Sequence, residues 1–358
     1  MLKGLVWARP AARLLRVLSP LWCSTAVWVL GEFICRLTEV KSVRIMLPAG
    51  NLVFQDYAIS ATSAAFVAKD YQARVTWGIA ELLVVLTSLV AIGLGARIIF
   101  SALRRESLAL KTIFGALILA ESWVGKQVSP PFPKEAFTFR AHDPNATLYP
   151  VIDSLVQHTL AKPGYLSSAD PGITIPRMMD LVGWPPTVAM VLIGLGFCAV
   201  LLRPLQSRSP ALEEDLRLAG QQVKWLLYAG AGLLVSGVSA VTAFYLWPVV
   251  FVPPEAPAAV TSAETIKSVA AVVALATGSI DSLLLLGVFL PAAYHLHKCA
   301  ERLVSSQEVA PGDREKWLEE KRLALSPAQQ LKPILAVLSP LLAGGSASAL
   351  INIFVGGG

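Results

Sequence analysis

Four carboxylates lie within or beside long apolar stretches of the chain, and they are the residues best suited to chemistry. Asp281 is at the midpoint of the apolar run Ser268–Tyr294 and is the only charged residue in it. An ionised carboxylate in the middle of a bilayer costs about 2.5 to 3.5 kcal/mol on insertion scales, so its helix must turn it toward protein or water. Asp281 is therefore a candidate proton or cation site. The alternative is a structural role, in which the side chain holds neighbouring helices together by hydrogen bonds.

The other three carboxylates are Glu32, Glu81 and Glu121. If successive apolar helices alternate in direction, each glutamate lies four to six residues from the midpoint of its run, on the same side of the membrane. That offset is about 6 to 9 Å along a helix, so the three share one depth. They predict an acidic vestibule that attracts cations, with Asp281 deeper in the bundle. The alternative is that each glutamate reaches the water of the headgroup region separately.

Common catalytic patterns are missing from the sequence. The four histidines, His142, His158, His295 and His297, fall outside or at the ends of the apolar runs, so an intramembrane serine would have no base. An intramembrane aspartyl protease needs two aspartates, whereas Asp281 is the only one deep in a run. The HExxH, Walker A, GxSxG and GxGxxG patterns do not occur. We therefore expect no catalytic residue, no metal and no cofactor, and an enzyme is the less favoured class.

The candidate residues are positioned by apolar runs about long enough to cross a bilayer, which takes roughly 17 to 25 residues. The chain of 358 residues is 55% hydrophobic and only 15% charged, whereas a soluble domain has roughly 25% charged residues. This composition excludes a water-soluble fold. The expected fold class is an all-α polytopic transmembrane helix bundle of about six spans, with an external Pro- and aromatic-rich cap and a charged helical cytoplasmic tail. The six runs are Val17–Cys35, Val75–Ala96, Leu108–Val124, Trp184–Leu202, Trp225–Trp247 and Ser268–Tyr294.

Lysine and arginine set the expected orientation, because positively charged loops stay in the cytoplasm. The segments after the second, fourth and sixth runs are rich in these residues, and the loop between the fifth and sixth runs has none before Lys267. We therefore expect a cytoplasmic N-terminus and a bacterial inner (plasma) membrane location. The basic start of the chain is also typical of a mitochondrial transit peptide, so the mitochondrial inner membrane is the alternative.

The order of runs and loops predicts four parts. Residues 1–125 form an N-terminal three-span bundle, 126–183 an extramembrane cap segment, 184–297 a C-terminal three-span bundle, and 298–358 a cytoplasmic tail with a C-terminal apolar helix. In the tail, Ser326 is an N-cap followed by proline at the first helical position. The later stretch Ile334–Val355 is long enough to cross, but prolines and glycines interrupt it. A seventh span, a re-entrant hairpin and a helix packed on the inner face all stay open.

Small residues predict close helix packing in the fifth run. Gly232, Ser236 and Ala240 recur every four positions, which lets two helix backbones approach closely. Packing within the chain is the simpler interpretation, and a partner subunit or a second copy is the alternative. Hydroxyl residues near the midpoints of three runs form a candidate polar layer at one depth: Ser24 and Thr25, Thr87 and Ser88, and Ser236 and Ser239.

A second small and polar face is expected around Asp281. Ala274, Thr277 and Gly278 lie on the same side of that helix by their spacing. Such a face is typical of a contact with a neighbouring helix.

For function, we expect a non-enzymatic assembly or signalling component of a membrane complex. Its expected partners are membrane lipids and, through the small-residue helix faces, partner subunits or a second copy. The alternative is a transporter or channel that moves protons or small cations past the three glutamates toward Asp281. Membrane orientation and anionic headgroups account for the net charge of +6, so nucleic acid is not an expected partner.

Overall fold

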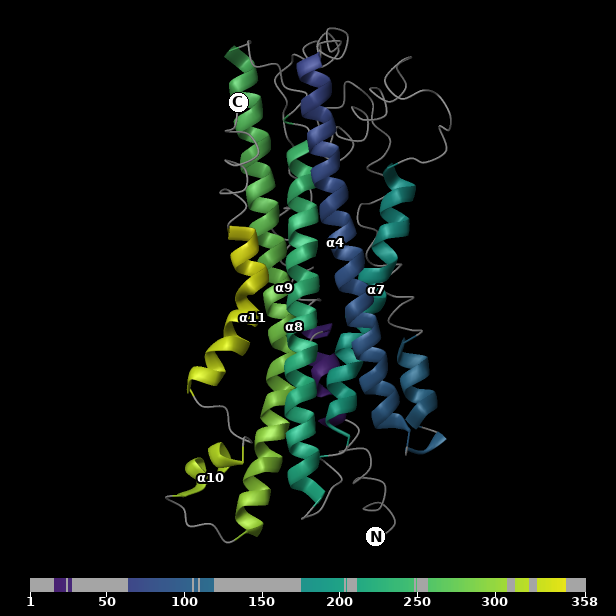
Figure 1. Ribbon diagram of the computed structural model, residues 1–358, viewed down its shortest axis with the longest axis vertical. Helices are drawn as coiled ribbons and strands as arrows, with labels where there is room; N and C mark the ends of the chain where they lie inside the picture. The colour runs from purple at the N-terminus through teal and green to yellow at the C-terminus, as the bar shows by residue number, and fades with distance from the viewer. Residues whose placement is uncertain are drawn as a thin grey trace.

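The structure, a computed structural model, is a bundle of long helices that lie side by side (Figure 1). It describes residues 16–23, 25–27, 64–104, 106–108, 110–118, 175–202, 204, 211–247, 249, 257–307, 313–321 and 327–345. Nearly all of these residues are helical, and no strand occurs among them. The prediction of an all-α fold is therefore confirmed for this part of the chain.

Four helices of the described part are long and apolar enough to cross a membrane. They contain all or most of the second, fourth, fifth and sixth predicted runs, and they are α4 (Ala64–Leu103), α7 (Ile175–Val200), α8 (Ala211–Leu246) and α9 (Pro257–Ser306). The first and third runs are described only in short pieces, which are helical over residues 19–23, 25–27 and 110–118. The rest of those runs and nearly all of the predicted cap lie outside the described residues.

The helices are longer than the apolar runs because polar helix formers continue them. α9 runs on past the apolar residues through Lys298 and Arg302 to Ser306, with no glycine or proline to end it earlier. Its extension packs against the start of α8, where Leu216 lies in one buried cluster with Cys299 and Leu303. A hydropathy window identifies only the apolar part of such a helix, so its ends extend beyond the sequence prediction.

Neighbouring helices contact one another through small residues and buried apolar side chains. α8 lies antiparallel to α4 and to α9, whereas α4 and α7 run in the same direction (Figure 1). At Gly95 of α4, a Cβ atom would come within 3.0 Å of the Leu192 backbone of α7, so only glycine fits that contact. The main buried cluster contains residues of α4, α7, α8, α9 and α11 (Pro327–Gly345).

α11 lies alongside α9 and α8 within the bundle and runs antiparallel to α9 (Figure 1). It begins at Pro327, the first helical position that the sequence predicts. Its C-terminal end reaches Ala274 of α9. Ala274 is about 31 Å along α9 from His295, the residue that follows the predicted apolar run of that helix. α11 therefore extends deep along the bundle, and the remainder of the predicted stretch up to Val355 lies outside the described residues.

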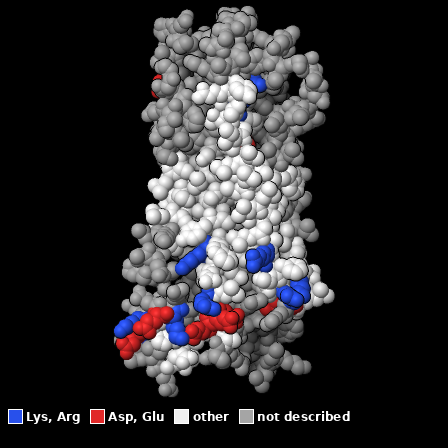
Figure 2. All heavy atoms as spheres, viewed as in Figure 1, with Lys and Arg blue, Asp and Glu red and all other residues white. Residues whose placement is uncertain are grey.

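Most charged side chains of the described part gather at one end of the bundle, the lower end in Figure 2. We call this the charged end; α4 and α9 finish there, and α8 begins there. The short helix α10 (Arg314–Glu320) also lies there, next to an ion pair of 3.0 Å between Lys321 and Glu213 of α8. Between the two ends the visible surface is almost free of charge, as expected for a surface that faces lipid tails.

Candidate functional site

Asp281 lies on a buried face of α9. The residues spaced three and four positions from it along the helix form what we call the inner seam of α9: Ala274, Gly278, Asp281, Leu285 and Val288. Ala274 is 0% exposed and Leu285 is 2% exposed, while Asp281 itself is half-buried. A carboxylate therefore occupies one position of a stripe that is otherwise small or apolar.

α11 docks against this seam through backbone contacts. A Cβ atom at Gly278 would collide with the Pro340 carbonyl of α11, and a Cβ atom at Gly344 of α11 would collide with the Ala274 carbonyl of α9. Each helix thus has a glycine that lies against a backbone carbonyl of the other helix. The two contacts are one helical turn apart. Such close approaches favour van der Waals packing, a main source of helix association in lipid, and also allow weak Cα–H···O bonds.

One conventional hydrogen bond strengthens the same contact. Pro340 has no N–H and disturbs the hydrogen-bond ladder of α11, and the next N–H, that of Leu341, donates to Ser282 Oγ of α9 at 3.0 Å. Ser339 Oγ donates to the Ala336 carbonyl at 2.8 Å, the group that Pro340 leaves without its usual donor. The segment around the proline that interrupts α11 therefore also links α11 to α9.

The carboxylate of Asp281 makes no hydrogen bond or ion pair with any residue that the structure describes. Ser282, its neighbour in sequence, is the residue that bonds across to α11. Asp281 thus lies beside the α9–α11 contact, but the hydrogen bond across that contact is made by Ser282. A carboxyl group in this position can hold a proton or accept hydrogen bonds, and when ionised it can attract a small cation.

Glu81 lies on α4 beside a group of aromatic side chains. Trp77, one turn before it, donates from Nε1 to Glu81 Oε1 at 3.0 Å. The Trp77 ring stacks on Trp247 of α8 with centroids 5.5 Å apart and lies 5.8 Å from the ring of Phe244. The Arg74 guanidinium is 5.6 Å from the centre of the Trp247 ring. Glu81 is therefore tied into a side-chain cluster that joins α4 to α8.

Glu81 and Asp281 lie at different depths. Thr87 of α4 is level with Ser236 of α8, since their hydroxyl oxygens are 2.9 Å apart. Leu285 of α9 lies against Gly230 of α8, which is six residues before Ser236. At 1.5 Å per residue, these contacts place Glu81 about 12 Å from Asp281 along the bundle. Glu32 and Glu121 lie outside the described residues, so Glu81 is the only part of the predicted vestibule that the structure locates.

The predicted packing stripe on α8 contributes to contacts inside the chain. Ser236 and Ala240 are buried, and the Ser236 hydroxyl is within hydrogen-bonding distance of Thr87 on α4. Gly232 is exposed, with no atom near the position of a Cβ. Each hydroxyl has one proton and also lies near a backbone carbonyl of its own helix, so the α4–α8 bond can form in either direction. The predicted hydroxyl layer is confirmed for this pair.

Among the described residues, no group of three histidine, cysteine, aspartate or glutamate side chains could hold a metal ion. Cys299 is buried in the cluster between α8 and α9, while His295 is half-buried one turn earlier. Their positions are those of a helix contact at the charged end.

Two residues of this region were not singled out by the sequence analysis. Ser282 follows Ala274 and Gly278 at four-residue spacing, and that spacing was the signal for its role. Trp77 precedes Glu81 by four residues, which places a donor and an acceptor one turn apart. A serine or a tryptophan in an apolar helix is too common for either to be chosen from the sequence alone.

Comparison with known proteins adds no family to these observations. No family model matches the chain, and no curated protein or solved structure matches it either.

Proposed function

We propose that the chain is a non-enzymatic component of a membrane complex, with a role in assembly or signalling. Its N-terminus is on the cytoplasmic side, so the charged end faces the cytoplasm, in a bacterial inner membrane or a mitochondrial inner membrane. The four long apolar helices support the membrane location.

The contact between α9 and α11 is the observation that carries this proposal. Glycines of both helices lie against the partner backbone, and the Leu341 N–H donates to Ser282. A backbone contact of this kind permits one register only, because a shift along either helix would put a side chain where a glycine now lies. α11 follows the charged residues of α10, so a fixed α11 couples the polar segment at the charged end to the interior of the bundle. Such coupling suits a component that assembles with, or responds to, a partner.

The test is the size of the particle formed by the full chain, extracted with native lipids from the membrane in which it is made. We expect a particle of fixed stoichiometry, larger than the 38.2 kDa chain. Gly278→Ala should lower the fraction found in this particle, because its Cβ would meet the Pro340 carbonyl. Gly93→Ala is the matched control, since nothing lies near that position and the fraction should not change. A wild-type chain that is always a single copy without partners would contradict the proposal.

The second candidate is a transporter or channel for protons or small cations that uses Asp281. It is favoured by one observation, the half-buried carboxylate on the inner seam without a partner among the described residues. Proteoliposome flux distinguishes the two functions. Transport predicts a proton or cation flux that Asp281→Asn abolishes and that Glu264→Gln leaves intact, because Glu264 is an exposed carboxylate near the start of α9. Flux equal to that of empty liposomes would exclude the transport function.

A further inference from the structure

One outward stripe of α4 changes abruptly from apolar to basic. Its residues follow a spacing of three and four positions, so they lie on one side of the helix. All are exposed, Val90 at 67% and Phe100 at 79%, and in order they are Ile79, Leu83, Leu86, Val90, Gly93, Arg97, Phe100 and Arg104. The distance from Ile79 to Arg97 is about 27 Å, close to the roughly 30 Å of a bilayer's hydrocarbon core. The stripe therefore has the length of the lipid tails and ends in an Arg-Phe-Arg group.

α8 also has an exposed aromatic residue and an exposed arginine at this end. Trp225 is exposed, and Arg217, also exposed, lies two turns nearer the charged end. The two helices are level there, because Ser101 of α4 and Gln222 of α8 line one small cavity of about 10 Å³. We call Arg97, Phe100, Arg104, Arg217 and Trp225 the basic–aromatic band. On α9, Lys298 lies over the ring of Tyr294 at 5.7 Å, which repeats the pairing of a base with an aromatic ring.

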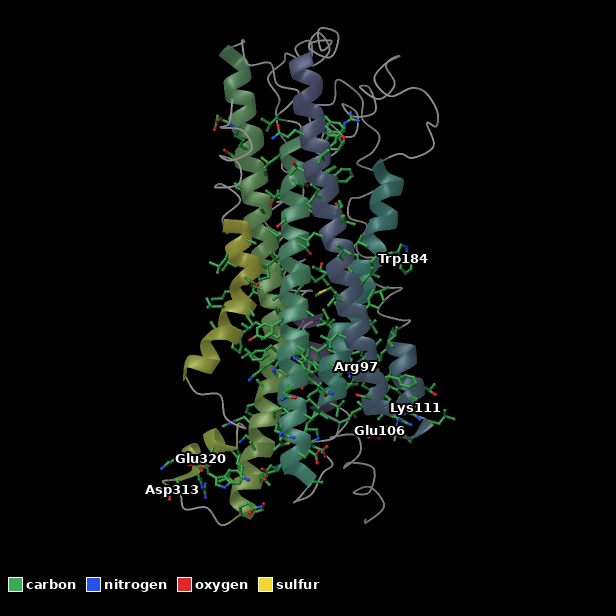
Figure 3. All side chains as sticks on the ribbon, viewed as in Figure 1. Arg97, Glu106, Lys111, Trp184, Asp313 and Glu320 are labelled. Carbon is green, nitrogen blue, oxygen red and sulfur yellow. The ribbon has the colours of Figure 1, made fainter. Side chains whose placement is uncertain are left out.

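The guanidinium groups of the band are available to bind an anion. The side chains of Arg97, Arg104 and Arg217 make no hydrogen bond or ion pair with any residue that the structure describes. Some acids of the charged end are already engaged: Glu213 pairs with Lys321, and Glu301 with Lys298. In Figure 3, Arg97 lies nearer the middle of the bundle than Glu106, and α10 with Asp313 and Glu320 lies farther out. On the face shown in Figure 2, basic side chains likewise come first after the uncharged belt.

We propose that the basic–aromatic band binds the phosphate groups of anionic phospholipids in the leaflet at the charged end. Arginine is suited to this role because its planar guanidinium can donate two parallel hydrogen bonds to a phosphate. Phe100 and Trp225 lie at the boundary between lipid tails and headgroups, which aromatic rings prefer. Lipid, rather than a free anion, is the ligand because the arginines end a stripe whose length matches the lipid tails. The proposal does not depend on the assembly role.

The test compares the full chain in nanodiscs of phosphatidylcholine alone with nanodiscs that contain about one third phosphatidylglycerol. We expect the anionic lipid to raise the midpoint of thermal unfolding at low salt, and 0.5 M NaCl to remove most of the rise. Retention of added phosphatidylglycerol by the detergent-purified chain, measured by native mass spectrometry, gives the affinity. Arg97→Gln with Arg104→Gln should lower that affinity roughly 25-fold, about fivefold for each base.

Two further variants and one ligand make the outcome decisive. Arg314→Gln with Lys316→Gln removes the same charge from exposed positions on α10 and should leave the affinity within about twofold. Arg97→Lys with Arg104→Lys should keep most of it, since the charge stays. Equal loss in the α10 variant would overturn the proposal, as would a wild-type chain that phosphatidylglycerol does not stabilise. Stabilisation by the same concentration of inorganic phosphate would also overturn it, because the band would then be a site for free anions.

Discussion

Two helix contacts in this molecule hold the bundle together in opposite ways. α4 and α8 meet near one end through large side chains, with Trp77 stacked on Trp247 and close to Phe244. α9 and α11 meet through backbone, with Gly278 and Gly344 lying against carbonyl groups of the partner helix. The first contact gains its energy from the area of its rings, and the second from how closely the helices approach.

The difference matters because lipid tails are as apolar as the side chains that would be buried. Burial alone therefore drives helix association less strongly in a membrane than in water. A contact made of rings tolerates a smaller ring, since neighbours can adjust around it. A contact between backbones does not tolerate even one added methyl group, since backbones cannot move aside. The α9–α11 contact thus specifies one register, whereas the α4–α8 contact mainly supplies binding energy.

Trp77→Ala should give the largest loss of stability. Trp-to-Ala changes in soluble cores cost about 3 to 5 kcal/mol, and we expect the lower part of that range, about 3 kcal/mol, because the transfer term is smaller in lipid. Trp77→Phe should keep most of the packing and lose chiefly the bond to Glu81. The free energy of unfolding in bicelles, followed by far-UV circular dichroism, measures both. A Phe variant as unstable as the Ala variant would show that the hydrogen bond to Glu81 within α4, and not the ring area against α8, accounts for the loss.

Gly278→Ala should cost about 2 kcal/mol, within the range for overpacking, although it adds only one carbon atom. The cause is the Pro340 carbonyl, which occupies the space where the Cβ would lie. Gly93→Ala adds the same atom in open space and should be neutral or slightly stabilising, because alanine favours the helix. Equal effects of the two changes would mean that α11 is not docked on α9 in the membrane.

Helix positions were predictable from the sequence because hydropathy and length determine where a chain can cross a bilayer. The four described spans contain all or most of the second, fourth, fifth and sixth predicted runs. Their ends were not predictable, because Lys298 and Arg302 continue α9 as a helix without being apolar. The predicted Thr87–Ser236 level was correct because both residues lie at the middle of their runs.

The docking of α11 was not predictable for a physical reason. Pro340 and Gly344 weaken a helix in isolation, so in the sequence they indicate interruptions of the apolar stretch. In the bundle the same segment makes the contact, because the Pro340 carbonyl lies against Gly278, the Leu341 N–H donates to Ser282, and Gly344 admits the Ala274 carbonyl. Helix propensity accounts only for how these residues destabilise an isolated helix. Their stabilising contacts become visible only when the position of α9 is known. Asp281 could be located on its helix from spacing, but not its relation to α11.

Asp281 is the polar residue next to the backbone contact, and its substitution tests whether it contributes to it. Asp281→Leu should weaken the bundle by about 0.6 to 2 kcal/mol if the carboxyl makes interhelical hydrogen bonds, as a structural role requires. Asp281→Asn should then be close to wild type, because the amide is nearly isosteric and can still form hydrogen bonds. Unfolding free energies in bicelles give both values. A Leu variant at least as stable as wild type would remove the structural role and leave transport as the reason for the carboxylate.

Ser282→Ala should have the smallest effect and is the sharpest probe of the backbone contact. It removes the acceptor of the Leu341 N–H but leaves the glycine contacts in place. Interhelical hydrogen bonds in membranes contribute about 0.6 kcal/mol on average, with a maximum near 1.7 kcal/mol, so the loss should lie near the lower value. Ser279→Ala is the matched control, because Ser279 Oγ donates to the Leu275 carbonyl of its own helix. Combined with Gly278→Ala, the Ser282 change should add less than its single effect, since a displaced α11 has already lost the bond. Full additivity of the two changes would mean that the hydrogen bond and the glycine contact do not belong to one docked state.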